Sequence, residues 1–118
     1  MSMSKSAAIR EAAKHVSVHG QRTSWQIIGP YRDDELSGPT TELTADSWFK
    51  ARGIAAIWKA RLALRLMGYV DAPGEYDYGF AVDHEHFRGV NDVPGLIDGA
   101  IEHVRIMREH TARRLAGS

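Results

Sequence analysis

The sequence predicts an α+β protein with three helices and a small antiparallel β-sheet packed around a central helix. Residues 46–67 form one long helical pattern with two separate apolar sides. Short strand-like runs precede this segment, and helical periodicity recurs towards both ends of the chain. A helix with two apolar sides is expected inside the protein, with neighbours on both sides.

The central helix is expected to run from Asp46 to Met67, with Thr44 or Asp46 as its N-cap and Gly68 as its left-handed C-terminal cap. At about 100° per residue, its apolar residues fall on two faces. One face contains Trp48, Ala51, Ala55, Trp58, Leu62 and Leu66, and the other Phe49, Ala56, Ile57, Ala60, Ala63, Leu64 and Met67. We expect the sheet to cover one face and the first or last helix to cover the other.

A further helix is expected at each end of the chain. Ser4 or Ser6 caps the first helix, which is predicted to end at His19–Gly20. Asp92 caps the last helix. This helix either packs its apolar stripe inward or uses it for dimerisation; the stripe contains Leu96, Ile97, Ala100, Ile101, Val104, Met107 and Leu115.

Three segments show strand-like patterns. Thr23–Gly29 contains Trp25 and Ile27 and is expected to pair with Thr40–Thr44. Tyr76–Val82 alternates bulky and small or polar residues with a period of two, which also indicates a strand.

The composition fits one domain spanning residues 1–118. The formal net charge is zero, but residues 47–67 sum to +5 and residues 68–92 to −5, so basic helices alternate with acidic connectors. The chain has no cysteine, no signal-like apolar run and no segment of the roughly 20 apolar residues that cross a membrane. We therefore expect a cytoplasmic protein without membrane contact.

The segment Asp83-His84-Glu85-His86 is the candidate metal site. In an extended chain, His84 and His86 would share one face and could bind a transition metal if a third ligand arrived. His103 and His110 lie two turns apart on the last helix and could share a face. This pattern keeps a metal-dependent hydrolase open as a second alternative function.

Two further surfaces are candidates for binding. The acidic loop with Asp33, Asp34 and Glu35, together with Tyr76 and Tyr78, could contact a partner. Carboxylates in a polar loop stay solvated, so we expect recognition here and not acid–base catalysis.

The basic stripe Lys50, Arg61 and Arg65 of the central helix could contact phosphates, because cations beside aromatic residues are typical of nucleic-acid binding. The competing interpretation is that Trp48 and Trp58 anchor the core while the long basic side chains extend to solvent.

No catalytic motif stands out. The chain has neither Rossmann nor P-loop glycine spacing, and its serines lack a nucleophile-elbow context. We expect a non-enzymatic protein that needs no cofactor.

Residues 4–68 resemble small accessory proteins of bacteriophages and prophages. The matching features are the helix Ala7-Ala8-Ile9-Arg10-Glu11-Ala12, the strand Ser24-Trp25-Gln26-Ile27 and the helix end Ala63-Leu64-Arg65-Leu66-Met67-Gly68. The resemblance implies a protein of the bacterial host cytoplasm that binds a host protein or protein complex. It extends to inhibitors of bacterial defence systems such as CRISPR-Cas. Direct nucleic-acid binding by the central helix is the alternative.

Overall fold

The computed structural model describes residues 2–32, 35–71 and 77–117. In these ranges the chain forms four helices and a three-stranded sheet, which confirms the α+β class with one helix more than the three expected. The elements in chain order are α1 (Lys5–His15), β1 (Ser17–Gly20), β2 (Trp25–Pro30), β3 (Thr40–Ala45), α2 (Trp48–Leu66), α3 (Tyr78–Phe87) and α4 (Val93–Ala116).

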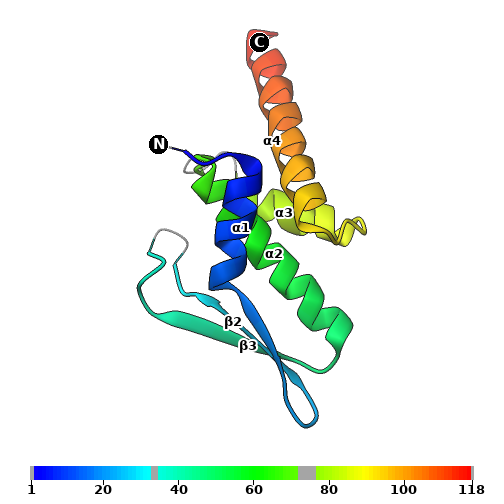
Figure 1. Cartoon of the computed structure of the whole chain (residues 1–118). Helices are drawn as coiled ribbons and strands as arrows, with labels where there is room; N and C mark the ends of the chain where they lie inside the picture. Colours follow the sequence, from blue (N-terminus) through cyan, green and yellow to red (C-terminus); the bar gives the residue numbers. More distant parts are fainter. Residues whose placement is uncertain (1, 33–34, 72–76, 118) are drawn as a thin grey trace.

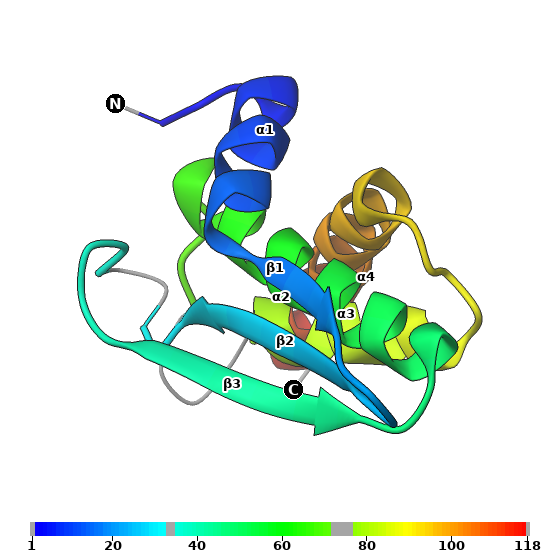
Figure 2. The same cartoon turned by 60° about the horizontal axis from the view of Figure 1, so that its bottom comes forward.

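The sheet is antiparallel with strand order β1-β2-β3. Ile27 lies opposite Val18 on one neighbour and Leu43 on the other. The sheet forms one layer and the helices lie behind it, with α1 continuing directly into β1 (Figures 1 and 2). The predicted pairing of the Trp25 strand with the Thr40 strand is therefore confirmed.

Helix α2 separates two apolar cores, as expected of a helix with two apolar sides, but Leu62 and Leu66 belong to the core opposite the face on which the sequence places them. Ala51 and Ala55 pack with Ile27 and Val16 beneath the sheet. Five residues of α2 belong instead to the larger core formed with α1, α3 and α4: Ala56, Ala60, Leu62, Ala63 and Leu64. The small side chains let neighbouring elements approach the α2 backbone closely from both sides.

Helices α2 and α3 end in the same way. Gly68 and Gly89 each follow a cap residue and adopt a left-handed φ, of 96° and 99°. The next residues close the turns, because Tyr69 N–H donates to Leu64 and Val90 N–H donates to Glu85 over 2.9 and 3.1 Å. Gly68 N–H and Gly89 N–H also donate, to Arg65 and His86, over 3.0 Å, and the two bonds at each helix end are those of a Schellman cap. The cap at Gly89 sets the direction in which the chain leaves α3 towards α4.

Two segments differ from the prediction. The first helix ends at His15, and Ser17–Gly20 forms β1, because alternating valines at 16 and 18 match the pleat beside β2. Tyr78–Phe87 is a helix and not a strand. Its buried residues recur at helical spacing, a period that the sequence also allows: Tyr78, Ala81, Val82 and Glu85.

The N-caps are partly as predicted. Ser4 caps α1 and Asp92 caps α4. The central helix, however, starts at Trp48 and its cap is Ser47, whose side chain accepts from Lys50 N–H. Thr44 and Ala45 pair with β2, so the strand ends too late for Thr44 to act as the cap.

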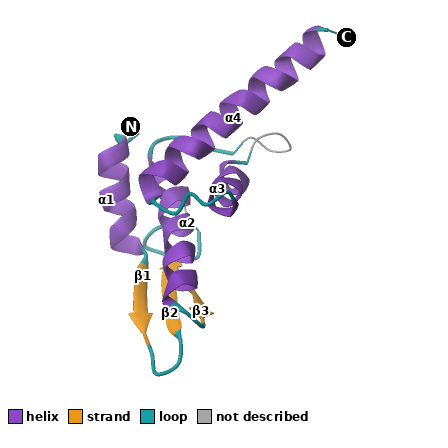
Figure 3. Ribbon diagram, turned by 90° about the vertical axis from the view of Figure 1, so that its right-hand side faces the viewer, coloured by secondary structure: helices purple, strands orange, loops and turns teal. Residues whose placement is uncertain are grey.

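The first half of helix α4 packs against the rest of the protein, and its second half projects away from it (Figures 1 and 3). Its buried residues are Leu96, Ile97, Ala100 and Val104, so the predicted stripe packs inward over these turns. Met107 and Leu115 from the same stripe are exposed. Within the described ranges, no helix is long and apolar enough to cross a membrane.

Replacing Gly89 with alanine is expected to lower the free energy of unfolding by about 1 kcal/mol, because a Cβ disfavours a left-handed backbone. No heavy atom lies within 4 Å of the added carbon, so the cost is conformational. Urea denaturation measures it. Gly117→Ala is the matched control, since Gly117 caps α4 at a φ of −86°. Equal stability of the two variants would contradict this account of the α3 cap.

Candidate binding groove

A large open groove lies between α2, β1 and the turn that joins α3 to α4. Its volume is about 620 Å³. Ten residues line it: Val18, Trp48, Arg52, Ala55, Ala56, Lys59, Gly89, Asn91, Asp92 and Val93. Three separate parts of the chain therefore build the walls of this groove.

Helix geometry places the functional side chains of α2 on one wall. Arg52 and Lys59 are seven residues apart, so they share a face and lie about 10 Å apart along the axis. Ala55 and Ala56 lie between them and leave room at the floor. The result is a shallow channel with two cations above small apolar residues.

Trp48 stands at the start of this wall and is 45% exposed. Its ring packs on Trp25, with ring centroids 4.8 Å apart and planes tilted by 53°. Trp25 in turn packs against the core beneath the sheet. This support holds the Trp48 ring while nearly half of its surface remains available for contact, which disagrees with the interpretation of Trp48 as a core anchor.

The two groove cations are uncompensated. Arg52 and Lys59 make no hydrogen bond and no ion pair with any residue in the described ranges. The carboxylate of Asp92 also faces the groove, but it is engaged as the α4 N-cap and accepts from Gly95 N–H. The groove is therefore positive on its α2 side and has one rigid aromatic ring.

The residues of the predicted basic stripe line several smaller hollows. Lys50 forms an exposed ion pair with Asp46 over 3.0 Å, and its hydrogen bond holds the pKa of the Asp46 carboxyl below its usual range. Arg61 and Arg65 line a cavity of about 40 Å³ beside Tyr69 and Tyr78, roughly 20 Å away along the helix. The structure thus brings Arg61 and Arg65 together but not Lys50.

The other predicted partner surfaces have different outcomes. Tyr78 is only 6% exposed, packs edge-on against Tyr69 at 5.3 Å and lies beneath the Arg108 guanidinium. This burial leaves little of the Tyr78 ring accessible to a partner. Glu35 is exposed, as expected for a solvated loop. Asp33, Asp34 and Tyr76 lie outside the described residues.

The predicted histidine pair is also separated. Because residues 78–87 are helical, His84 and His86 point about 200° apart instead of sharing a face. His86 contacts α2 at Gly53, where an added Cβ would lie 2.9 Å from the imidazole Cε1. His84 instead packs against His103 of α4, while His110 is exposed two turns further along.

The Trp48–Arg52–Lys59 groove was missed at the level of sequence, although a signal existed. Trp48, Arg52, Ala55 and Lys59 follow each other at intervals of four, three and four residues, which is the spacing of a single helix face. In the sequence, however, Trp48 falls on one of the two apolar faces of the central helix, which favours its burial.

Comparison with known proteins adds no family to this description. No protein-family model, no curated protein and no solved structure matches the chain. The groove must therefore be interpreted from its own chemistry.

The groove cations should be dispensable for folding. The double replacement Arg52→Gln and Lys59→Gln is expected to change the free energy of unfolding by no more than about 0.5 kcal/mol, since neither cation has an ionic partner. Leu62→Ala, at a site with 1% exposure, should cost about 2–5 kcal/mol in the same urea titration. A large loss in the double variant would show that the cations have structural partners.

Proposed function

We propose that this protein is a small non-enzymatic binding protein whose partner is a host protein or protein complex, as the resemblance to phage accessory proteins implies. The observation that carries the proposal is the supported Trp48 ring beside the uncompensated cations Arg52 and Lys59. Tryptophan and arginine are the residues that most often dominate the binding energy of protein interfaces. We assign the groove to an acidic segment of the partner, because that charge complements both cations.

A second candidate ligand is single-stranded nucleic acid. An exposed aromatic ring next to cations can stack a base while the cations hold the backbone. Two observations favour a protein partner instead. The three strands contain no lysine or arginine, so the sheet offers no cations for phosphates, and the whole chain has zero net charge.

The experiment is an affinity pull-down from bacterial host lysate, with and without nuclease, using wild type and the variant Arg52→Glu, Lys59→Glu. We expect a specific partner that survives nuclease and is lost in the variant. Once it is identified, Trp48→Ala should raise the Kd about 30-fold, the effect of removing an interface hot spot.

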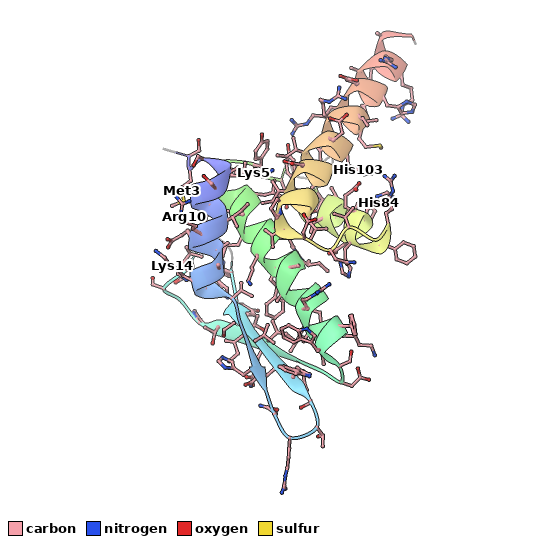
Figure 4. The ribbon with its side chains drawn as sticks, turned by 45° about the vertical axis from the view of Figure 1, so that its right-hand side comes forward. Met3, Lys5, Arg10, Lys14, His84 and His103 are labelled. Carbon is pink, nitrogen blue, oxygen red and sulfur yellow. The ribbon has the colours of Figure 1, made fainter. Side chains whose placement is uncertain are left out.

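Arg10→Glu is the matched control. Arg10 is an exposed cation on the outer side of α1, away from the groove (Figure 4). Its reversal should leave binding unchanged. A signal that vanishes with nuclease and weakens steeply with salt would replace the protein partner with nucleic acid. A partner retained by the groove variant would refute the assignment of this groove.

The acidic loop supplies a separate hypothesis within the same function. In an inhibitor of a defence system such as CRISPR-Cas, Asp33, Asp34 and Glu35 would imitate nucleic-acid phosphates on a basic host surface. Replacing all three with alanine should then release the partner captured in the pull-down. If the triple variant captures it as well as wild type does, the mimicry hypothesis fails while the groove assignment stands.

A further inference from the structure

Three metal-ligating side chains meet where α3 packs on α4. His84 and Glu85 come from α3 and His103 from α4, and one ligand atom from each lies within 4.8 Å of the other two. The two imidazole rings are adjacent, with centroids 4.8 Å apart and planes inclined by 37° (Figure 4). Helix packing and not sequence proximity brings His103 to this place, 18 residues beyond Glu85.

The polar atoms of this cluster are incompletely paired for their burial. His84 Nδ1 is buried and makes no hydrogen bond. Arg88 Nη1 forms a long ion pair with the Glu85 carboxylate at 3.6 Å, and His84 Nδ1 lies 3.8 Å from it, both beyond hydrogen-bond distance. Glu85 is only 8% exposed and is the sole buried charged residue in the described ranges, whereas the Arg88 side chain is 65% exposed. A solvated cation at this distance compensates a buried carboxylate only partly, and a bound metal ion would complete the compensation.

The packing around Glu85 leaves room for its carboxylate. Gly99 of α4 lies directly opposite, and a Cβ there would be 2.7 Å from Glu85 Cγ and 2.8 Å from Oε2. His103 is one helical turn beyond Gly99, on the same face of α4. The glycine therefore admits the carboxylate beneath the His103 imidazole, where all three groups converge.

We propose that His84, Glu85 and His103 bind a divalent transition-metal ion of the Zn²⁺ type. Two imidazoles and one carboxylate are a ligand set that zinc accepts, with bonds of about 2.0–2.2 Å. Two such ligands of a tetrahedral ion lie about 3.4 Å apart. The ligand atoms lie within 4.8 Å of one another, so ion binding requires them to close by up to about 1.4 Å and the two rings to turn out of their stack.

The ion would clamp α3 to α4. It would neutralise Glu85, occupy a nitrogen of His84 and tie both to the helix that projects from the body. Three protein ligands leave a fourth position of a tetrahedral ion for water. This assignment replaces the predicted pair His84 and His86, which the helix separates.

The test is calorimetric titration of Zn²⁺ into the full chain carrying no histidine tag. We expect one ion per chain, and a Tm raised by about 5–10 °C when free zinc exceeds the Kd a hundredfold. His103→Ala should weaken binding about 100-fold or more, and Glu85→Gln at least about tenfold. Co²⁺ in place of Zn²⁺ should give the visible absorption bands of a four-coordinate ion in wild type only.

His86→Ala is the matched control, because its Nδ1 is also buried without a partner but faces the opposite side of α3. It should bind zinc like wild type, and circular dichroism verifies that each variant folds. Absence of saturable binding by wild type overturns the site. So does binding that persists in His103→Ala, or that is lost equally in His86→Ala.

Discussion

The structure depends on the burial of α2 from two sides. Its alanines leave so little side-chain volume that the sheet and the helical core both approach its backbone. Burial on both sides confines the five cations of α2 to the two seams where the layers do not meet. Arg52 and Lys59 emerge along one seam, and Lys50, Arg61 and Arg65 along the other. The position of the candidate groove therefore follows from the architecture, because the cations of α2 reach solvent along these two seams.

The position of α3 explains why two glycines lie inside helices. A helix-interior glycine costs about 1 kcal/mol relative to alanine. Gly53 of α2 admits the His86 ring, and Gly99 of α4 admits the Glu85 carboxylate. Because neighbouring residues of α3 face different helices, each helix that contacts α3 needs its own gap. Glu85 and His86 are therefore held between helices, whereas Asp83 of the same helix is exposed.

The sequence allowed the class, the two-sided central helix and the main strand pairing to be predicted, because those patterns are long and have one period. It did not allow α3 or β1 to be predicted. Residues 78–85 are compatible with both a period of two and a helical stripe, and packing against α2 and α4 decides between them. The candidate groove could not be predicted for the same reason, because its position depends on how the elements pack. Trp48 looks apolar in sequence, and its exposure follows from where β1 and the α3–α4 turn end.

The metal cluster and the groove are chemically unrelated but share one piece of backbone. The carbonyl of Glu85 accepts from Val90 N–H, and the carbonyl of His86 accepts from Gly89 N–H. Gly89 and the residues that follow it form one wall of the groove. The same short segment therefore carries two of the proposed ligands and positions that wall. A change to this backbone must disturb both sites, whereas a change to the His103 or Arg52 side chain reaches only one. Side-chain variants are thus the means by which the two proposals can be judged independently.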